Sequence, residues 1–231
     1  MAQPGADTAT ALLAIDHLAL RVVDRDEVAA FLCEHCGMQR AESPEGFSVL
    51  GPPGGRTKLF LFEADEPPAH GVLERVVLRV SDLERASAML PDGLEVSHAD
   101  PQLTVFQGPQ GLGLGLTSVL GGGVDYDVDH LVLRVMDPDE TTIALAELGF
   151  VPRGGGLQVA DKHLRLQPGI RSAGENELLS HIGVLVESVE AVRGQALRGG
   201  LELDELTLAP NELGVYVRGP ERIRVEYTER S

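Results

Sequence analysis

The sequence has few cysteines, few positive charges and no long hydrophobic stretch. Its 231 residues include two cysteines, too few for a disulfide framework and consistent with a reducing compartment. Lysine and arginine number 19 against 36 acidic residues, and the formal charge of −17 argues against a nucleic acid or an anionic membrane as partner. No apolar run approaches the roughly 20 residues of a membrane span, and residues 1–14 lack the basic segment of a secretory signal. We therefore expect a cytoplasmic globular protein.

The two cysteines, Cys33 and Cys36, form a C-x-x-C pair that could hold zinc or a reactive thiolate. The pair falls inside a predicted helix, and the sequence has no second pair to complete a zinc site. Small apolar cysteines are common on buried helix faces. We interpret them as packing residues.

A ten-residue motif occurs twice, 113 positions apart, as IDHLALRVVD at 15–24 and VDHLVLRVMD at 128–137. Related strands occur at 75–82 (RVVLRVSD) and 181–188 (HIGVLVES), so the motif recurs about every fifty residues. A unit of this length cannot bury its apolar face alone and must pack on its neighbours. The chain is therefore predicted to consist of four related modules.

Each module reads as a strand, a helix and three further strands. Helices are predicted at 26–36, 83–90, 140–148 and 189–197, and Pro138 stands at a plausible N1 position leading into the third. The pattern predicts an α+β fold of four βαβββ modules. The glycine run at 121–123 predicts a boundary between a domain over 1–120 and a domain over 127–231.

Side-chain alternation assigns two faces to each strand. One face is apolar and is expected to carry the helices. The opposite face collects polar side chains, which are His130, His181, Glu226, Tyr216, Arg218, His163 and Arg165. A curved sheet with helices outside would turn this face into the lining of a cavity.

The four modules and their placed residues resemble the vicinal oxygen chelate superfamily, which includes glyoxalases, bleomycin-resistance-type binding proteins and type I extradiol dioxygenases. The resemblance covers nearly the whole chain and implies that two modules curl into a half-barrel around a divalent metal. Closest is the extradiol dioxygenase arrangement, which implies His130, His181 and Glu226 as ligands, all in the domain over 127–231.

Two imidazoles and one carboxylate on one side of an ion leave coordination positions open for substrate and O₂, as suits Fe(II). Manganese, nickel or zinc would also be compatible. The segment YVRGPERIRVE at 216–226 resembles the closing hairpin of the dioxygenases, and the resemblance implies that Tyr216 hydrogen-bonds a substrate oxygen. It further implies that His163 acts as acid and base. Packing or surface roles for these residues remain alternatives.

Two departures from the dioxygenase pattern are visible. The stretch before the tyrosine lacks a further histidine, and Asn211 stands there instead. In the first domain His17 matches His130, but Arg75 and Gly115 stand where the other ligands would be. A glyoxalase-like pairing of His17 with Glu63 would still lack ligands from the second module. We expect the first domain to bind no metal.

The sequence thus predicts an Fe(II)-dependent extradiol-type dioxygenase acting on a catechol-like aromatic and O₂. One alternative is a metal-dependent lyase or isomerase of glyoxalase type. Another is a non-catalytic protein that binds a drug or metabolite. A homo-oligomer is compatible with the sequence, which does not identify the substrate or the native metal.

Overall fold

The computed structural model describes residues 11–41, 46–119, 123–170, 174, 176–207 and 212–230. Its elements repeat one order four times, a strand, a helix and three strands, which confirms the predicted α+β fold of βαβββ modules. No helix within these ranges is long and apolar enough to cross a bilayer.

The modules follow one another along the chain. Module 1 comprises β1 (Leu12–Val22), α1 (Arg25–His35), β2 (Gln39–Ala41), β3 (Phe47–Gly51) and β4 (Lys58–Glu63). Module 2 comprises β5 (Leu73–Val80), α2 (Leu83–Ser87), β6 (Val96–Asp100), β7 (Leu103–Gln107), the short turn η1 (Pro109–Gly111) and β8 (Gly113–Ser118). Module 3 comprises β9 (Val128–Val135), α3 (Pro138–Glu147), β10 (Val151–Arg153), β11 (Gly156–Val159) and β12 (Lys162–Pro168). Module 4 comprises β13 (Leu179–Val186), α4 (Val189–Arg198), β14 (Glu202–Thr207), β15 (Glu212–Arg218), the short turn η2 (Pro220–Arg222) and β16 (Arg224–Arg230).

The last residue of the repeated motif caps the helix that follows it. The side chains of Asp24, Asp82, Asp137 and Ser188 accept hydrogen bonds from backbone N–H groups in the first turn of their helices. Such caps satisfy donors that have no partner inside the helix and contribute about 1 kcal/mol each. The recurrent Asp or Ser therefore marks the change from strand to helix in all four modules.

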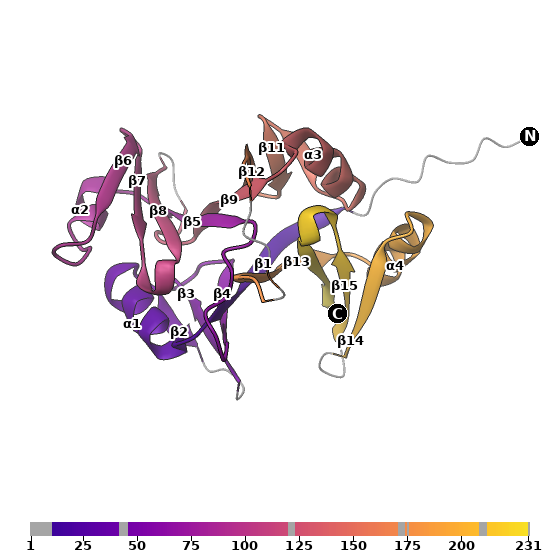
Figure 1. The fold of residues 1–231 in the computed structure, drawn as a ribbon, viewed down its shortest axis with the longest axis horizontal. Coiled ribbons are helices and arrows are strands. Elements are labelled where there is room, and N and C mark those ends of the chain that lie inside the picture. Colours follow the sequence, from indigo (N-terminus) through magenta and orange to yellow (C-terminus); the bar gives the residue numbers. More distant parts are fainter. Residues whose placement is uncertain are drawn as a thin grey trace, which may run out of the picture.

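In the described part of the chain, sixteen strands form two sheets of eight strands each. The first has the order β14-β15-β16-β13-β1-β4-β3-β2 and joins modules 1 and 4; we call it half-barrel A. The second has the order β10-β11-β12-β9-β5-β8-β7-β6 and joins modules 2 and 3; we call it half-barrel B. In each, the opening strands of the two modules meet in antiparallel fashion at the centre. Figure 1 shows modules 2 and 3 above modules 1 and 4.

This pairing corrects the expected division into domains over 1–120 and 127–231. Each expected domain contains one module from each half-barrel. The glycine run at 121–123, of which only Gly123 is described, joins modules 2 and 3, which share a sheet. The reason is that related modules present equivalent opening strands, so the repeat itself does not encode which two will pair.

Two linkers carry the chain between the sheets and lie side by side. The backbone N–H of Ala69 donates to the carbonyl of Asn176 over 2.9 Å, and the N–H of Leu178 donates to the carbonyl of Ala69 over 2.8 Å. One linker leads from module 1 to module 2 and the other from module 3 to module 4. Their pairing fixes the crossing from half-barrel A to half-barrel B and back.

Consecutive modules also contact each other through the η turns. The N–H of Val23 donates to the side chain of Gln110 in η1 over 2.7 Å, and the N–H of Met136 donates to Glu221 in η2 over 2.9 Å. Val23 and Met136 occupy the same place in the motif. The pair of modules 1 and 2 is therefore related to the pair of modules 3 and 4 by approximate internal symmetry.

Strand alternation separates core from concave face as predicted. In β1, Leu18, Leu20 and Val22 are buried, and α1 contributes Val28 and Leu32 to the same core.

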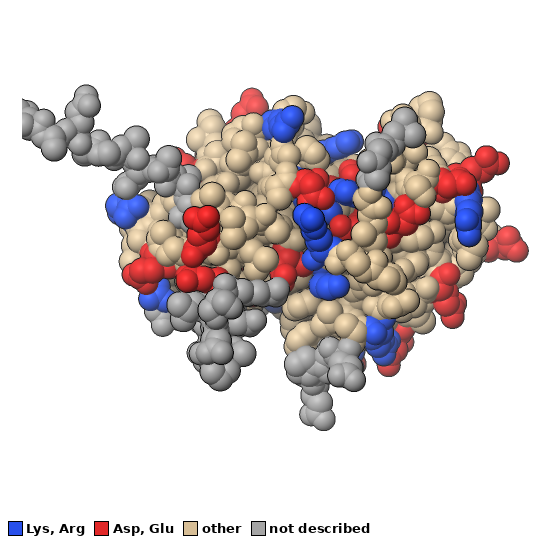
Figure 2. Space-filling view, turned by 180° about the vertical axis from the view of Figure 1, so that it is seen from behind, with Lys and Arg blue, Asp and Glu red and all other residues tan. Residues whose placement is uncertain are grey.

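Charge is distributed unevenly on the outside: on the face shown in Figure 2, basic side chains gather around the middle, although acidic residues predominate in the chain.

Candidate metal centre

Three buried side chains converge on the concave face of half-barrel A. His17 lies on β1, His181 on β13 and Glu226 on β16, which are neighbouring central strands. In the sheet register, Gly183 lies opposite both His17 and Glu226. A side chain at position 183 would collide with the His17 imidazole, so the glycine leaves space for the ring.

The atoms that face one another are two imidazole nitrogens and one carboxylate oxygen. The Nε2 atoms of His17 and His181 are 3.0 Å apart, and Oε2 of Glu226 lies 3.0 Å from Nε2 of His181 and 3.7 Å from Nε2 of His17. The three residues are between 4% and 6% exposed. Imidazole nitrogen and carboxylate oxygen are ligands that zinc and first-row transition metals accept.

The spacing of these atoms fits a bound ion. Two ligands at ~2.1 Å from one metal and at a right angle would lie about 3.0 Å apart, and a wider angle gives a longer separation. The three measured distances fall in this range. The donor set and its spacing therefore fit one divalent metal with three protein ligands.

A second layer of side chains orients the three residues. Asp16 accepts a hydrogen bond from Nδ1 of His17 over 3.0 Å, and Oγ of Ser180 lies 3.2 Å from Nδ1 of His181. Thr228 donates to Oε1 of Glu226 over 3.2 Å. Metal-binding histidines commonly use the outer nitrogen in this way, which directs the inner nitrogen toward the ion.

The electrostatics favour a charged carboxylate. Burial alone would raise the pKa of Glu226, but His17 and His181 hold that pKa well below its usual range. Burial lowers the pKa of His17, yet Asp16 and Glu226 outweigh burial and raise it. Burial lowers the pKa of His181, and Glu226 offsets this only in part. The carboxylate is thus ionised and ready to coordinate a cation at neutral pH.

Tyr216 lies beside this cluster, as the sequence predicts. It stands opposite Glu226 in the register of β15 and β16, and its ring centroid is 5.1 Å from that of His181. The guanidinium of Arg224 stacks on the Tyr216 ring at 3.9 Å. Burial, followed by the negative charge of Glu226, raises the pKa of Tyr216. Its hydroxyl therefore stays protonated and can donate a hydrogen bond.

The sequence analysis missed an aromatic wall on module 1. The ring of His17 stacks on Phe60 at 4.2 Å, and Phe47 stacks on both Phe60 and Phe62. Phe62 is also tilted against His181, with a ring separation of 6.4 Å. The chain has only six phenylalanines, so three at one site is a marked concentration. The alternation in KLFLFE at 58–63 could have placed Phe60 and Phe62 on one face.

His130 and His163 lie elsewhere, which corrects the predicted ligand set. They face each other on β9 and β12 of half-barrel B, away from His181 and Glu226 on half-barrel A. Nδ1 of His130 bonds to Asp129 over 2.7 Å, and among the described residues no group hydrogen-bonds its buried Nε2. The candidate ligands are therefore His17, His181 and Glu226 instead of His130, His181 and Glu226.

The half-barrel register explains why half-barrel B has no equivalent cluster. The position of Glu226 corresponds to Phe60 in module 1, Gly115 in module 2 and Arg165 in module 3. Arg75 takes the place of the second histidine in half-barrel B. Within the described residues, the cluster of His17, His181 and Glu226 is the one group of three side chains close enough to share an ion.

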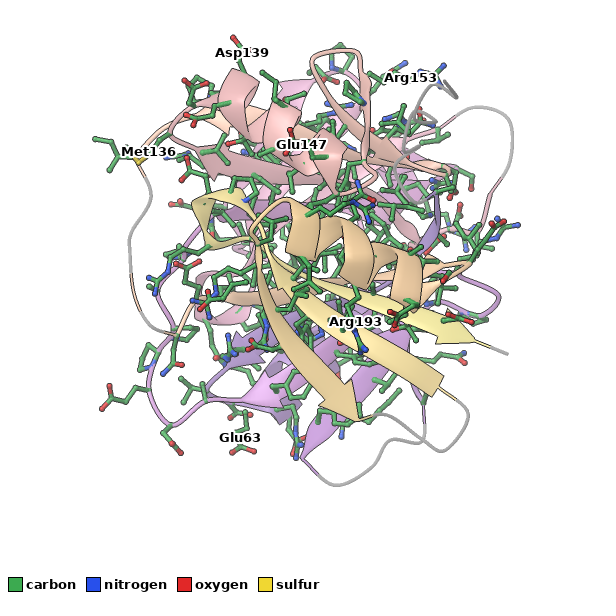
Figure 3. The ribbon with its side chains drawn as sticks, turned by 90° about the vertical axis from the view of Figure 1, so that its right-hand side faces the viewer. Glu63, Met136, Asp139, Glu147, Arg153 and Arg193 are labelled. Atoms are coloured by element: carbon green, nitrogen blue, oxygen red, sulfur yellow. The ribbon has the colours of Figure 1, made fainter. Side chains whose placement is uncertain are left out.

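Other candidate residues are placed away from the centre. Glu63 is paired with Arg25 at 3.9 Å and lies at the periphery in Figure 3, so it does not join His17. Cys33 is partly buried on α1, Cys36 is buried directly after the end of α1, and both are free thiols. Asn211 lies outside the described residues.

Comparisons with known proteins bear on the family and the fold. Residues 14–92 match the family model of the Glyoxalase/Bleomycin resistance protein/Dioxygenase superfamily. No curated protein sequence matches the chain. The sequence-based resemblance to this superfamily is thus confirmed over module 1 and the start of module 2.

Several solved structures share the fold over almost the whole chain. A V278E mutant of glyoxalase I from Zea mays has a TM-score of 0.72 at 16% identity, covering 96% of this chain and 92% of its own. A presumed dioxygenase from Bacillus subtilis subsp. subtilis str. 168 has a TM-score of 0.71 at 17% identity, and the match covers 96% of this chain and 86% of that protein. The cppA protein from Streptococcus pneumoniae TIGR4 has a TM-score of 0.67 at 15% identity, and the match covers 95% of this chain and 99% of that protein. Identities this low establish the glyoxalase-like fold alone.

Proposed function

We propose that this protein is an Fe(II)-dependent extradiol-type dioxygenase that opens the ring of a catechol-like aromatic with O₂. The observation that carries the proposal is the set of three buried ligand atoms from His17, His181 and Glu226. Phe60 stands where module 1 could supply a fourth ligand. Three protein ligands leave positions for two substrate oxygens and O₂, the arrangement typical of non-heme iron oxygenases.

The surrounding residues suit an aromatic substrate. Bound iron would supply the redox chemistry needed to combine a catechol with O₂. The phenylalanine wall offers apolar ring faces against which the substrate can stack. Tyr216 stands opposite Glu226, and burial raises its pKa further above neutral, so its protonated hydroxyl would donate a hydrogen bond to a substrate oxygen.

A redox-neutral reaction of the same superfamily is the second candidate. The acid–base histidine implied by the resemblance, His163, lies on half-barrel B, and this removes one group expected of the dioxygenase. A lyase or isomerase would need only a metal that polarises a substrate oxygen and a nearby proton donor. Tyr216, whose hydroxyl is protonated, could meet the second requirement.

Metal analysis followed by oxygen uptake tests the proposal. Protein purified without air should contain one ion per chain, and the iron-loaded form should consume O₂ with at least one catechol and form a yellow ring-opened product. Tyr216→Phe should lower turnover while metal content stays unchanged. Full iron loading without O₂ uptake across simple, alkylated and biaryl catechols would overturn the dioxygenase proposal. Zinc or nickel in the purified protein would favour the lyase or isomerase.

A further inference from the structure

A second pocket adjoins the candidate metal centre. It has a volume of about 110 Å³ and is lined mainly by polar side chains. Four arginines line it, which are Arg21, Arg218, Arg222 and Arg224. Only 19 of the 231 residues are basic and the chain carries a charge of −17, so four arginines around one small pocket run against the overall composition.

The guanidinium groups are held in place by contacts around the pocket. Arg21 donates to the backbone carbonyl of Glu177 over 3.4 Å, and Arg222 donates to the carbonyl of Gly174 over 3.2 Å. A neutral carbonyl orients a guanidinium without cancelling its charge.

Acidic side chains balance part of this charge. Arg218 pairs with Glu202 and Arg224 with Asp204, each at 3.2 Å, and Glu177 also lines the pocket. These three carboxylates stand against four guanidinium groups. Counted over the described residues, these contacts leave the pocket with positive charge.

Two contacts connect the pocket to the metal centre. Ser180 lines the pocket and lies within hydrogen-bonding distance of His181. Arg224 lines the pocket and stacks on Tyr216. Arg21 also lines the pocket and lies on β1, the strand that carries His17. An extended ligand could thus reach both places at once.

We infer that the substrate carries an anionic group, a carboxylate or a phosphate, which is bound by Arg21 and Arg222 while the oxygens of the substrate face His17, His181 and Glu226. Planar guanidinium groups bind such anions with charge-assisted, often paired hydrogen bonds. The volume is sufficient for one anionic group and too small for an aromatic ring together with it. The ring is then left to the phenylalanine wall.

This inference rests on the proposed function for the identity of the ring, but binding of the anion requires no metal. The experiment therefore has a metal-free part and a metal-loaded part. In the metal-free part, benzoate and inorganic phosphate are titrated calorimetrically into wild-type protein, Arg21→Gln and Arg222→Gln. Arg40→Gln is the matched control, since Arg40 forms an exposed ion pair with Asp26 at 2.9 Å and does not line the pocket.

The wild type and the Arg40 variant should bind one of the two anions, and both pocket variants should bind it at least about tenfold more weakly. A preference for benzoate over phosphate identifies the group as a carboxylate, and the reverse preference identifies a phosphate. No binding of either anion by the wild type, or equal binding by all four proteins, overturns the inference. Catalytic failure with every catechol would leave these results unaffected, so the two proposals fail separately.

In the metal-loaded part, zinc replaces iron so that binding is measured without turnover. Catechol, its two carboxylated forms 2,3- and 3,4-dihydroxybenzoate, and catechol monophosphate are titrated in turn. At least one anionic ligand should bind about tenfold more tightly than catechol, and Arg222→Gln should remove this preference while leaving catechol affinity unchanged. Equal affinity of the wild type for all four ligands, or a parallel loss of catechol binding in the variant, would contradict the inference.

Discussion

The two half-barrels share one scaffold and differ at three of four equivalent positions. Half-barrel A has His17 and His181 on its opening strands and Phe60 and Glu226 on the strands beside them. At these places half-barrel B has the following residues: His130, Arg75, Arg165 and Gly115. A concave sheet therefore does not by itself bring three possible metal ligands together. Over the described residues, half-barrel B lacks such a cluster because one histidine and the glutamate are replaced.

The two histidines of the repeated Asp-His motif provide the sharpest test of this comparison. His17→Ala should lower metal affinity by more than about 100-fold, because a direct ligand matters more than the contacts that support it. His130→Ala, a change of equal size at the equivalent position of half-barrel B, should leave one ion per chain. Metal content measured by mass spectrometry decides between them. Loss of the ion in the His130 variant, or retention in the His17 variant, would remove the assignment to half-barrel A.

The aspartates that precede these histidines extend the comparison. Asp16→Asn should lower metal affinity by about 10- to 100-fold, because Asp16 holds Nδ1 of His17 and so directs Nε2 toward the ion. Asp129→Asn makes the same change beside His130 and should have no effect on the ion. Competition with a chromogenic chelator would measure both affinities. An equal effect of the two variants would indicate a general electrostatic contribution instead of an orienting contact.

The space between the opening strands gives a smaller expected effect. Gly183→Ala should destabilise the protein by about 1–3 kcal/mol and weaken metal binding, because the added methyl group collides with the His17 ring. Gly194→Ala in α4 is the control, since a helical glycine gains about 0.5–1 kcal/mol from alanine. Urea unfolding with and without metal would show both effects. A Gly183 variant as stable as wild type would mean that His17 has room to move.

The smallest effect concerns the cysteine pair, a feature of module 1 with no counterpart in the other modules. Burial raises the pKa of the Cys36 thiol to about 12, so it should not react with a thiol reagent in the native protein at pH 8. Cys33→Ser should leave metal content unchanged. Rapid labelling of both thiols, or loss of the ion in the variant, would contradict the interpretation of the two cysteines as packing residues.

Much of the fold follows from the sequence because its signals are local. Alternation within the strands and the Asp or Ser at the end of the repeated motif define each strand and each helix start. His181, Glu226 and Tyr216 could be placed on the concave face by the same alternation. Their convergence with a metal is a proposal that the distances support.

The pairing of modules could not be obtained in this way. IDHLALRV and VDHLVLRV are almost equivalent locally, so nothing near His17 or His130 indicates which one meets His181. That choice depends on which opening strands pair. The pairing involves contacts between residues far apart in the sequence, including those between the two linkers. The error in the predicted ligand set was therefore an error of long-range topology.

The pairing of module 1 with module 4 also has a consequence for the order of folding. His17 and His181 are separated by 164 positions, and Glu226 is more distant still along the chain. Closing a loop of this length costs on the order of 5 kcal/mol in chain entropy. During synthesis all strands of half-barrel B emerge before β13 and β16, so half-barrel B can form while half-barrel A still lacks module 4. The pairing of β1 with β13 would then form last. An ion held by all three ligands would stabilise this contact between the first strand of the chain and two strands of the last module.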